Sequence, residues 1–308
     1  MLILIAGITG YLGRELAKYG LAKQHQIRGF GRSPSKLPPH LLDQLESFVQ
    51  CDDYQDRAVL DKALSGVDAV ICAYYPIASA VIESQLSLFR AVERAGVKIY
   101  HAHSWNFDWS KLKFGDFELY DSYISFRRQV ELTSSIKPVF VFTGLFAELS
   151  VSEHFGIGNI VDSPDGKVLT YWGDGDTRWS FTYMPDAARF SMDLITTNQA
   201  VLNGEGGLFS VQSAAASARD LAAAYEKKTG DKVQLKSLGS VEDAEAKLTH
   251  VRTTSGMAAF FTIAYLYGQV ATIRGWWNLD NPKTVGSPDA VERLFDSQID
   301  RSAEFGLG

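Results

Sequence analysis

The first thirteen residues constrain the fold more than any other part of the chain. A continuous apolar run at residues 2–6 is followed at once by Gly7, Gly10 and Gly13, in the spacing GxxGxxG. Such a run is typical of a strand buried on both faces of a parallel sheet. The glycines allow a tight turn, and the helix expected over residues 14–22 would direct its positive end at a ligand there. The pattern therefore predicts a pyrophosphate site that opens a βαβ unit.

Apolar runs and amphipathic stretches alternate through the first half of the chain. Runs with the character of buried strands lie at residues 26–31, 48–51, 69–73, 98–102 and 139–143. Helical stretches lie around them, at residues 14–22, 56–64, 77–95 and 120–134. Strands that alternate with helices at this spacing form βαβ units. The sequence therefore predicts an α/β fold with a doubly wound parallel sheet of the Rossmann type.

The alternation weakens after residue 149. One more strand is expected at residues 167–172, with helices at residues 184–194 and 218–228. We expect an NADP-binding Rossmann domain over residues 1–150, to which residues 180–200 return. The rest is expected to form a smaller substrate-binding lobe, over residues 151–179 and 201–308.

Composition argues against several classes of partner. The formal net charge is −6 and no run is rich in lysine and arginine, so a nucleic-acid groove is not expected. Cys51 and Cys72 form no CxxC or Cys/His cluster, so neither a metal site nor a disulfide framework is predicted. The N-terminus has no basic leader, and the apolar stretch at residues 256–271 is shorter than the roughly 20 residues of a membrane span. These features predict a cytoplasmic monomer or homodimer that acts on a small molecule.

Basic and hydroxyl side chains follow the second expected strand. Arg32 and Ser33 stand where an acidic residue would favour NAD by binding the ribose 2′-hydroxyl, and Lys36 comes shortly after. A guanidinium can hold a 2′-phosphate through two charge-assisted hydrogen bonds and can stack on adenine. We therefore expect NADPH as the cofactor. Lys36 is either a second phosphate contact or a solvated surface charge.

Further cofactor contacts are expected where the neighbouring strands end. Asp52 follows the third strand, where its carboxylate can bind the adenine amine or cap the loop. Ala73 and Tyr74 close the fourth strand, and ligands sit at the carboxyl ends of such strands. The expected cofactor-binding residues are Gly7, Thr9, Gly10, Tyr11, Leu12, Gly13, Arg32, Ser33, Lys36, Asp52, Ala73 and Tyr74.

The glycine loop and three later segments resemble a known family. They are GITGYLG at residues 7–13, GDGDT at 173–177, SFT at 180–182 and PDAARF at 185–190. Together they are similar to the isoflavone-reductase-like, NmrA-like branch of the atypical short-chain dehydrogenases, fungal members in particular. The similarity runs from residue 1 to about residue 189 and continues weakly to residue 232. The resemblance implies an NADPH-dependent oxidoreductase of secondary metabolism.

The resemblance also points to a catalytic position in the helix expected at residues 120–134. Plant members carry a lysine there, and ordinary short-chain dehydrogenases carry a tyrosine with a lysine four residues later. In this chain Tyr123 takes the position of the acid, and Arg127 takes the position of the lysine of ordinary dehydrogenases. Residues four apart share a helix face, so Arg127 is expected to lower the Tyr123 pKa. Ser104, after the fifth strand, matches the serine that polarises the substrate carbonyl in ordinary dehydrogenases. The alternative is that Tyr123 is an aromatic residue of the core and Arg127 a charged residue of the surface.

Imidazole and aromatic side chains are the candidates for substrate contacts. His101 and His103 alternate along the fifth strand and so point to one face. Trp105 follows them, and Phe146 follows the sixth strand. We expect His103, Trp105 and Phe146 to line the substrate site, while a structural role in the core remains the alternative for His103 and Trp105.

The leading interpretation is an NADPH-dependent reductase. It would transfer a hydride to a carbonyl or conjugated alkene of a small, aromatic, natural-product-like molecule. Two alternatives stay open: a non-catalytic NADP-binding regulator, as the NmrA-like resemblance implies, and an isomerase or cyclase that keeps the fold.

Overall fold

The computed structural model describes residues 1–75, 77, 79–150, 160–164, 166–255 and 259–296. The chain divides into two compact units. The first comprises residues 1–105, 109–142 and 184–209, and the second comprises residues 106–108, 143–183 and 210–308. No helix among the described residues is long and apolar enough to cross a membrane.

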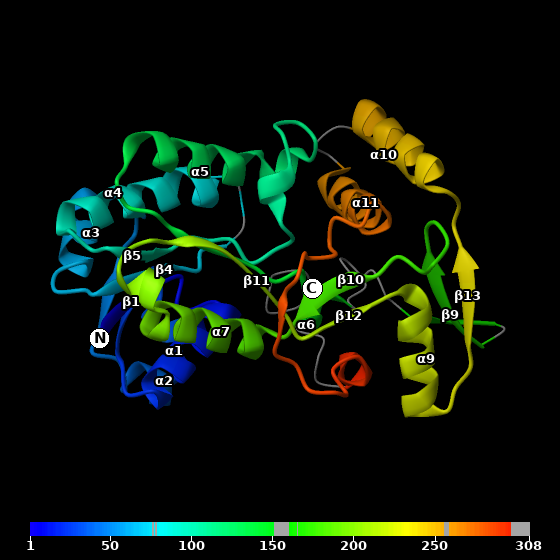
Figure 1. The fold of residues 1–308 in the computed structure, drawn as a ribbon, viewed down its shortest axis with the longest axis horizontal. Coiled ribbons are helices and arrows are strands. Elements are labelled where there is room, and N and C mark those ends of the chain that lie inside the picture. Colours follow the sequence, from blue (N-terminus) through cyan, green and yellow to red (C-terminus); the bar gives the residue numbers. More distant parts are fainter. Residues whose placement is uncertain (76, 78, 151–159, 165, 256–258, 297–308) are drawn as a thin grey trace. The chain divides into compact units, whose positions relative to one another are not determined.

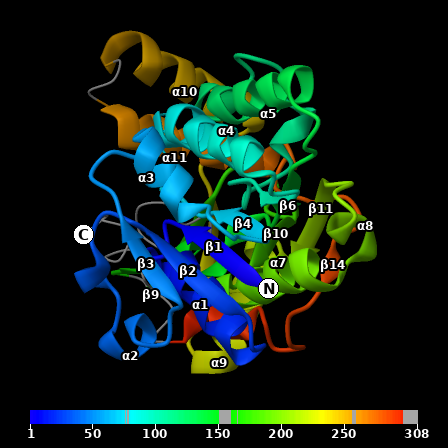
Figure 2. The ribbon, with the colours of Figure 1, turned by 90° about the vertical axis from the view of Figure 1, so that its left-hand side faces the viewer.

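A parallel sheet forms the centre of the first unit. Its strands are β1 (Leu2–Ala6), β2 (Gln26–Gly31), β3 (Ser47–Gln50), β4 (Ala69–Cys72), β5 (Ile99–His101), β6 (Val139–Phe142) and β11 (Gly207–Gln212). Figure 2 shows them side by side in the order β3-β2-β1-β4-β5-β6-β11, although β5 carries no label there. The short β14 (Lys283–Thr284) pairs with the last two residues of β11, all four of which belong to the second unit. The predicted doubly wound parallel α/β sheet is confirmed.

Helices cover both faces of this sheet (Figure 1). One face carries α1 (Tyr11–Ala22) and α7 (Met184–Thr197), and the other carries α3 (Arg57–Ala63), α4 (Gln85–Ala95) and α5 (Asp121–Thr133). Short helices α2 (Pro39–Leu42) and α8 (Gln199–Leu202) complete the unit. Gly20 allows α1 to approach closely, because a Cβ there would lie 2.7 Å from Ile27 and 3.0 Å from Met192. The helix expected at residues 77–95 begins, within its described part, with a π-helical turn at Ala80–Ser84 before α4.

An aromatic core fixes α5 against the sheet. The Phe89 ring of α4 packs edge-on against Tyr100 of β5, with centroids 5.1 Å apart, and against Phe126 of α5 at 5.9 Å. All three side chains are fully buried. This packing sets the rotation of α5 and so determines where Tyr123, one turn before Phe126, points.

In its described residues, the second unit holds two small sheets and three longer helices. One sheet has the order β12-β10-β7 and the other β13-β9-β8. Its strands are β7 (Leu145–Phe146), β8 (Ile160–Ser163), β9 (Gly166–Tyr171), β10 (Trp179–Thr182), β12 (Ala214–Ala216) and β13 (Val233–Ser237). Its helices are α6 (Ala147–Ser150), α9 (Ala218–Thr229), α10 (Val241–Ser255) and α11 (Phe260–Ile273). The sequence predicted β9 and α9 but not the other strands, each of which has five residues or fewer.

Candidate active site

The glycine loop begins where β1 ends, and its three glycines have different tasks. Gly7 has a φ of +81°, and a Cβ there would lie 2.2 Å from the Ala73 carbonyl oxygen. A Cβ on Gly13 would lie 2.4 Å from the Gly7 carbonyl oxygen. A Cβ on Gly10 would meet only that same oxygen, at 3.4 Å, and Gly10 is exposed. Gly7 and Gly13 are therefore required by the packing of the loop, whereas Gly10 leaves open space above it.

That open space faces the first turn of α1. Gly10 is the N-cap, no side chain caps the helix, and the first turn has no acidic residue. Tyr11 and Leu12 belong to this turn, Thr9 directly precedes its N-cap, and all three are partly exposed. Uncapped N–H groups and the positive end of the helix dipole attract an anion. The loop could therefore hold a pyrophosphate.

The carboxyl ends of β2, β3 and β4 lie at the same edge of the parallel sheet as the loop. Arg32 follows β2 directly, and its guanidinium carbon stands 5.6 Å from the centre of the Tyr54 ring. Ser33 and Lys36 close a 3₁₀ turn in which the Lys36 N–H donates to the Ser33 carbonyl, and the Lys36 side chain is exposed. Asp52 is exposed just after β3. We refer to Gly7–Gly13, Arg32, Lys36 and Asp52 as the glycine-loop edge.

Ala73 and Tyr74 contribute to this edge in different ways. The Ala73 N–H donates to the Ala6 carbonyl at 2.8 Å, and the Ala73 carbonyl lies directly against Gly7. The backbone of Ala73 thus meets the loop. The Tyr74 ring is buried against Tyr54, with centroids 4.6 Å apart. The Tyr74 hydroxyl has no hydrogen-bond partner among the described residues.

A buried hydrogen bond joins His103, after β5, to Tyr123 of α5. The Tyr123 hydroxyl lies 3.1 Å from His103 Nε2. Burial lowers the pKa of His103 to about 4, so its ring is neutral at pH 7, and burial raises the pKa of Tyr123. If Nε2 carries the proton of the neutral ring, it donates to the Tyr123 oxygen and leaves the hydroxyl proton of Tyr123 free. His103 Nδ1 has no partner in the part of the chain that the structure describes. We refer to these two residues as the His–Tyr pair.

Arg127 does not act on Tyr123 as the sequence suggested. Its Nε pairs with Glu131 Oε1 at 2.7 Å, one turn further along α5. The pKa of Tyr123 is raised by burial, and Arg127 is not among the groups that shift it. The expected lowering of the Tyr123 pKa is therefore wrong, because the cation is taken by a nearer carboxylate and desolvation dominates.

Ser104 is fully engaged in holding two strands together. Its Oγ donates to the Ala102 carbonyl at 3.0 Å and accepts from the Val141 N–H at 2.8 Å. The residue is completely buried. Its hydroxyl proton is thus already used within the protein, and a role in polarising a substrate carbonyl would require that bond to break.

His101 and Trp105 lie beside the His–Tyr pair but are satisfied within the core. Their rings stack with centroids 4.5 Å apart, and the Trp105 Nε1–H donates to Ser191 Oγ at 2.8 Å. His101 Nε2 lies 3.2 Å from the same hydroxyl. His103 and Trp105 make an edge contact at 6.0 Å, so the two expected substrate residues of the first unit are brought together. Phe146 lies in β7 of the second unit, where it is partly exposed.

Gln85, which no sequence motif marked, positions His103. Gln85 Oε1 accepts from the His103 backbone N–H at 2.6 Å, and Gln85 Nε2 donates to the Val81 carbonyl at 3.0 Å. A glutamine on the same helix face as Leu88, Phe89 and Val92 is a buried polar group, which needs a partner. That pattern was the available signal. Ser191 gave none, because a serine within a helix is common on either face.

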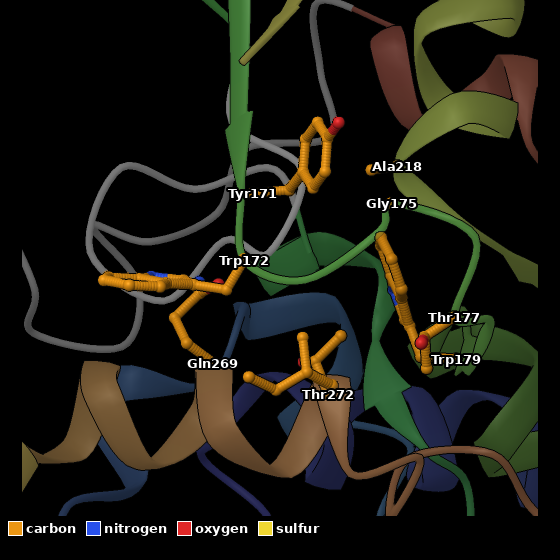
Figure 3. A pocket seen from close by; sticks show the side chains of 9 residues that line it. Tyr171, Trp172, Gly175, Thr177, Trp179, Ala218, Gln269 and Thr272 are labelled. Atoms are coloured by element: carbon orange, nitrogen blue, oxygen red, sulfur yellow. The ribbon is translucent and has the colours of Figure 1, made fainter. Parts of the chain in front are cut away.

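The second unit contains a small hollow between the end of β9, the start of β10 and α11 (Figure 3). Trp172, Trp179 and Gln269 are among its walls. The Trp179 Nε1–H has no partner among the described residues. The cavity volume is about 20 Å³, which holds a water molecule but not an aromatic ring. We therefore assign the hollow no substrate.

The described residues contain no group of three or more His, Cys, Asp or Glu placed to hold a metal ion. The fold agrees with the comparisons with known proteins.

A phenylcoumaran benzylic ether reductase of Ginkgo biloba is 27% identical over 199 residues, which cover 62% of this chain and 63% of the relative, less than two thirds of its length. A bifunctional pinoresinol-lariciresinol reductase of Linum perenne is 25% identical over 277 residues, which cover 85% of this chain and 86% of the relative.

Among solved structures, the binary complex of leucoanthocyanidin reductase with NADPH from Vitis vinifera is similar in fold, with a TM-score of 0.71 and 18% identity. The match covers 99% of this chain and 98% of that one. The sequence profile of the NmrA-like family matches residues 1–282. The match spans most of the chain, so the resemblance noted in the sequence is confirmed and the protein belongs to the NmrA-like family.

Proposed function

We propose that the protein is an NADPH-dependent reductase of a small aromatic molecule, with the first unit as its cofactor domain. The observation that carries the proposal is the open space above Gly10 at the uncapped start of α1. The named activities of the ginkgo and flax relatives support reduction of a phenylpropanoid-like substrate. The residues of the glycine-loop edge fit the cofactor, since a cation follows β2 and no acidic side chain stands there.

Bound NADPH would supply a hydride. The Gly7–Gly13 loop and the start of α1 would hold its pyrophosphate, and Arg32 with Ser33 its 2′-phosphate. Lys36 would add a second positive charge, and Asp52 would accept from the adenine amine. Phe146 of β7 is a further proposed substrate contact.

The His–Tyr pair is the proposed source of the proton. When a hydride adds to a carbonyl carbon or conjugated alkene, the developing anion needs a proton. Tyr123 would donate its hydroxyl proton, and His103 Nε2–H would stabilise the phenolate that remains. A neutral His103 can make this hydrogen bond only while its Nε2 is protonated. The orientation by Gln85 holds His103 in place for this role.

A second candidate is an NADP-binding regulator without turnover. The engagement of Arg127 with Glu131 and of Ser104 with two backbone groups favours it, because two of the three expected catalytic side chains are already occupied. This candidate keeps the cofactor site and needs no proton donor.

One experiment separates the two. The purified protein is titrated with NADPH and then assayed for loss of NADPH absorbance with aromatic ketones, enones and benzylic ethers. Turnover of any of these substrates supports the reductase. Saturable NADPH binding without turnover across the panel supports the regulator, and failure to bind NADPH contradicts both.

A further inference from the structure

Arg32 rests on an aromatic face. Its guanidinium carbon lies 5.6 Å from the centre of the Tyr54 ring, within the range of a cation–π contact. Tyr54 belongs to the loop between β3 and α3, so it is more than twenty residues away along the chain. Nothing in the sequence marked it, because no motif relates a tyrosine in this loop to the arginine after β2.

The Tyr54 ring is itself held from two sides. It packs against Tyr74 with centroids 4.6 Å apart and against the edge of Phe30 at 5.9 Å. Asp53 Oδ1 accepts the Gln55 N–H at 2.8 Å and so shapes the loop around it. The exposed Arg32 side chain therefore meets a fixed, partly buried surface.

The position of this ring matters because carboxylates stand close by. Asp52 and Asp53 directly precede Tyr54 in the sequence, and both are exposed. Their charges and that of Arg32 all act on the neighbouring Cys51 thiol, which shows that they share one electrostatic environment. Even so, Arg32 forms no ion pair with any carboxylate in the described ranges. A guanidinium paired with aspartate would be less available to a phosphate.

We infer that Tyr54 is a positioning residue for cofactor preference: its ring holds the Arg32 guanidinium at the end of β2, away from Asp52 and Asp53, ready for a 2′-phosphate. This inference rests on the proposed placement of the 2′-phosphate at Arg32. Tyr54 touches the arginine and not the phosphate. Its loss should therefore weaken recognition of the 2′-phosphate and spare the rest of the nucleotide.

The test compares two nucleotide fragments that differ by this one group. The full chain is titrated calorimetrically with 2′,5′-ADP and with 5′-ADP. In Tyr54→Leu we expect about a threefold to tenfold loss of affinity for 2′,5′-ADP, the effect of one cation–π contact, with little change for 5′-ADP. Tyr54→Phe keeps the ring face and loses only the hydroxyl, which also interacts with Arg32, so its affinity for 2′,5′-ADP should fall less than that of Tyr54→Leu. Tyr19→Leu, a matched substitution on α1, should change neither affinity.

Two further variants keep the inference open to contradiction if Tyr54→Leu does not fold. Arg32→Lys keeps the charge but not the planar group that stacks on an aromatic ring, so it should lower the preference for 2′,5′-ADP as Tyr54→Leu does. In a protein that already carries Arg32→Ala, adding Tyr54→Phe should change neither the affinity for 2′,5′-ADP nor that for 5′-ADP.

The outcomes distinguish a failure of the 2′-phosphate placement at Arg32 from a failure of the role proposed for Tyr54. A preference that survives Arg32→Ala overturns the placement of the 2′-phosphate, and the inference with it. If Arg32→Ala abolishes the preference while Tyr54→Leu and Arg32→Lys leave it intact, the inference about Tyr54 alone is wrong. An equal loss for both fragments in Tyr54→Leu also overturns it, because that result indicates general damage to the loop.

Discussion

The glycine-loop edge and the His–Tyr pair are built in opposite ways. The edge presents backbone N–H groups and exposed side chains, with Gly10 and Arg32 open to solvent. The pair is buried, and its two side chains are hydrogen-bonded to each other. The edge depends on local chain geometry, whereas the pair depends on packing between α4, β5 and α5. Binding and chemistry should therefore respond separately to substitution.

The largest effect is expected at Tyr123. Tyr123→Phe keeps the ring and removes the hydroxyl that contacts His103. General acid catalysis contributes about 10²–10⁴-fold, so turnover should fall by that factor while NADPH affinity stays constant. Steady-state kinetics and a separate NADPH titration measure the two quantities. Arg127→Ala should change turnover by no more than about threefold, because it removes only a partly exposed ion pair.

Two results would contradict this view of the pair. Full turnover in Tyr123→Phe would exclude this hydroxyl as the proton donor and direct attention to Tyr120, whose ring lies 5.2 Å from that of Tyr123. A loss in Arg127→Ala equal to that in Tyr123→Phe would restore the sequence-based mechanism.

The next largest effect is expected on NADPH binding at the glycine-loop edge. Gly10→Val should fill the space above the loop and weaken NADPH binding by about 100-fold or more, equivalent to about 2.8 kcal/mol. The thermal midpoint should stay close to that of the unsubstituted protein, because a Cβ there meets only one atom at 3.4 Å. Gly13→Ala is the matched contrast. Its Cβ would lie 2.4 Å from the Gly7 carbonyl oxygen, so it should lower the thermal midpoint itself.

Unchanged NADPH affinity in a folded Gly10→Val variant would show that the loop is not the cofactor site. Equal thermal destabilisation by both glycine substitutions would contradict the division of tasks within the loop.

The difference between the glycine-loop edge and the His–Tyr pair also explains which site features the sequence could predict. The glycine spacing, the strand before it and Arg32 after β2 are close together in the chain, so sequence pattern was enough to place them. The contact of Tyr54 with Arg32 and the hydrogen bond of Gln85 with His103 join residues that only the fold brings together. The ion pair of Arg127 with Glu131 depends on which rotamer Arg127 adopts. Periodicity gave the face on which Tyr123 and Arg127 lie. It could not show that burial outweighs the arginine in setting the tyrosine pKa.

The smallest effect should appear in acid, from the buried histidines. Burial lowers the pKa of both His101 and His103 from 6.5 to about 4 in the folded protein. Below pH 6.5 the unfolded chain binds protons that the folded chain does not, so stability is retained above pH 6.5 and is lost as the pH falls towards 4. One such histidine costs at most about 1.4 kcal/mol per pH unit in this range. Urea unfolding at pH 7 and pH 5 measures the loss. His103→Gln keeps a polar side chain that does not titrate and should reduce the loss, whereas His250→Gln, at an exposed position of α10, should not. An identical loss in all three proteins would show that burial of His103 does not govern the acid response, and the pair would then lose the feature that most distinguishes it from the glycine-loop edge.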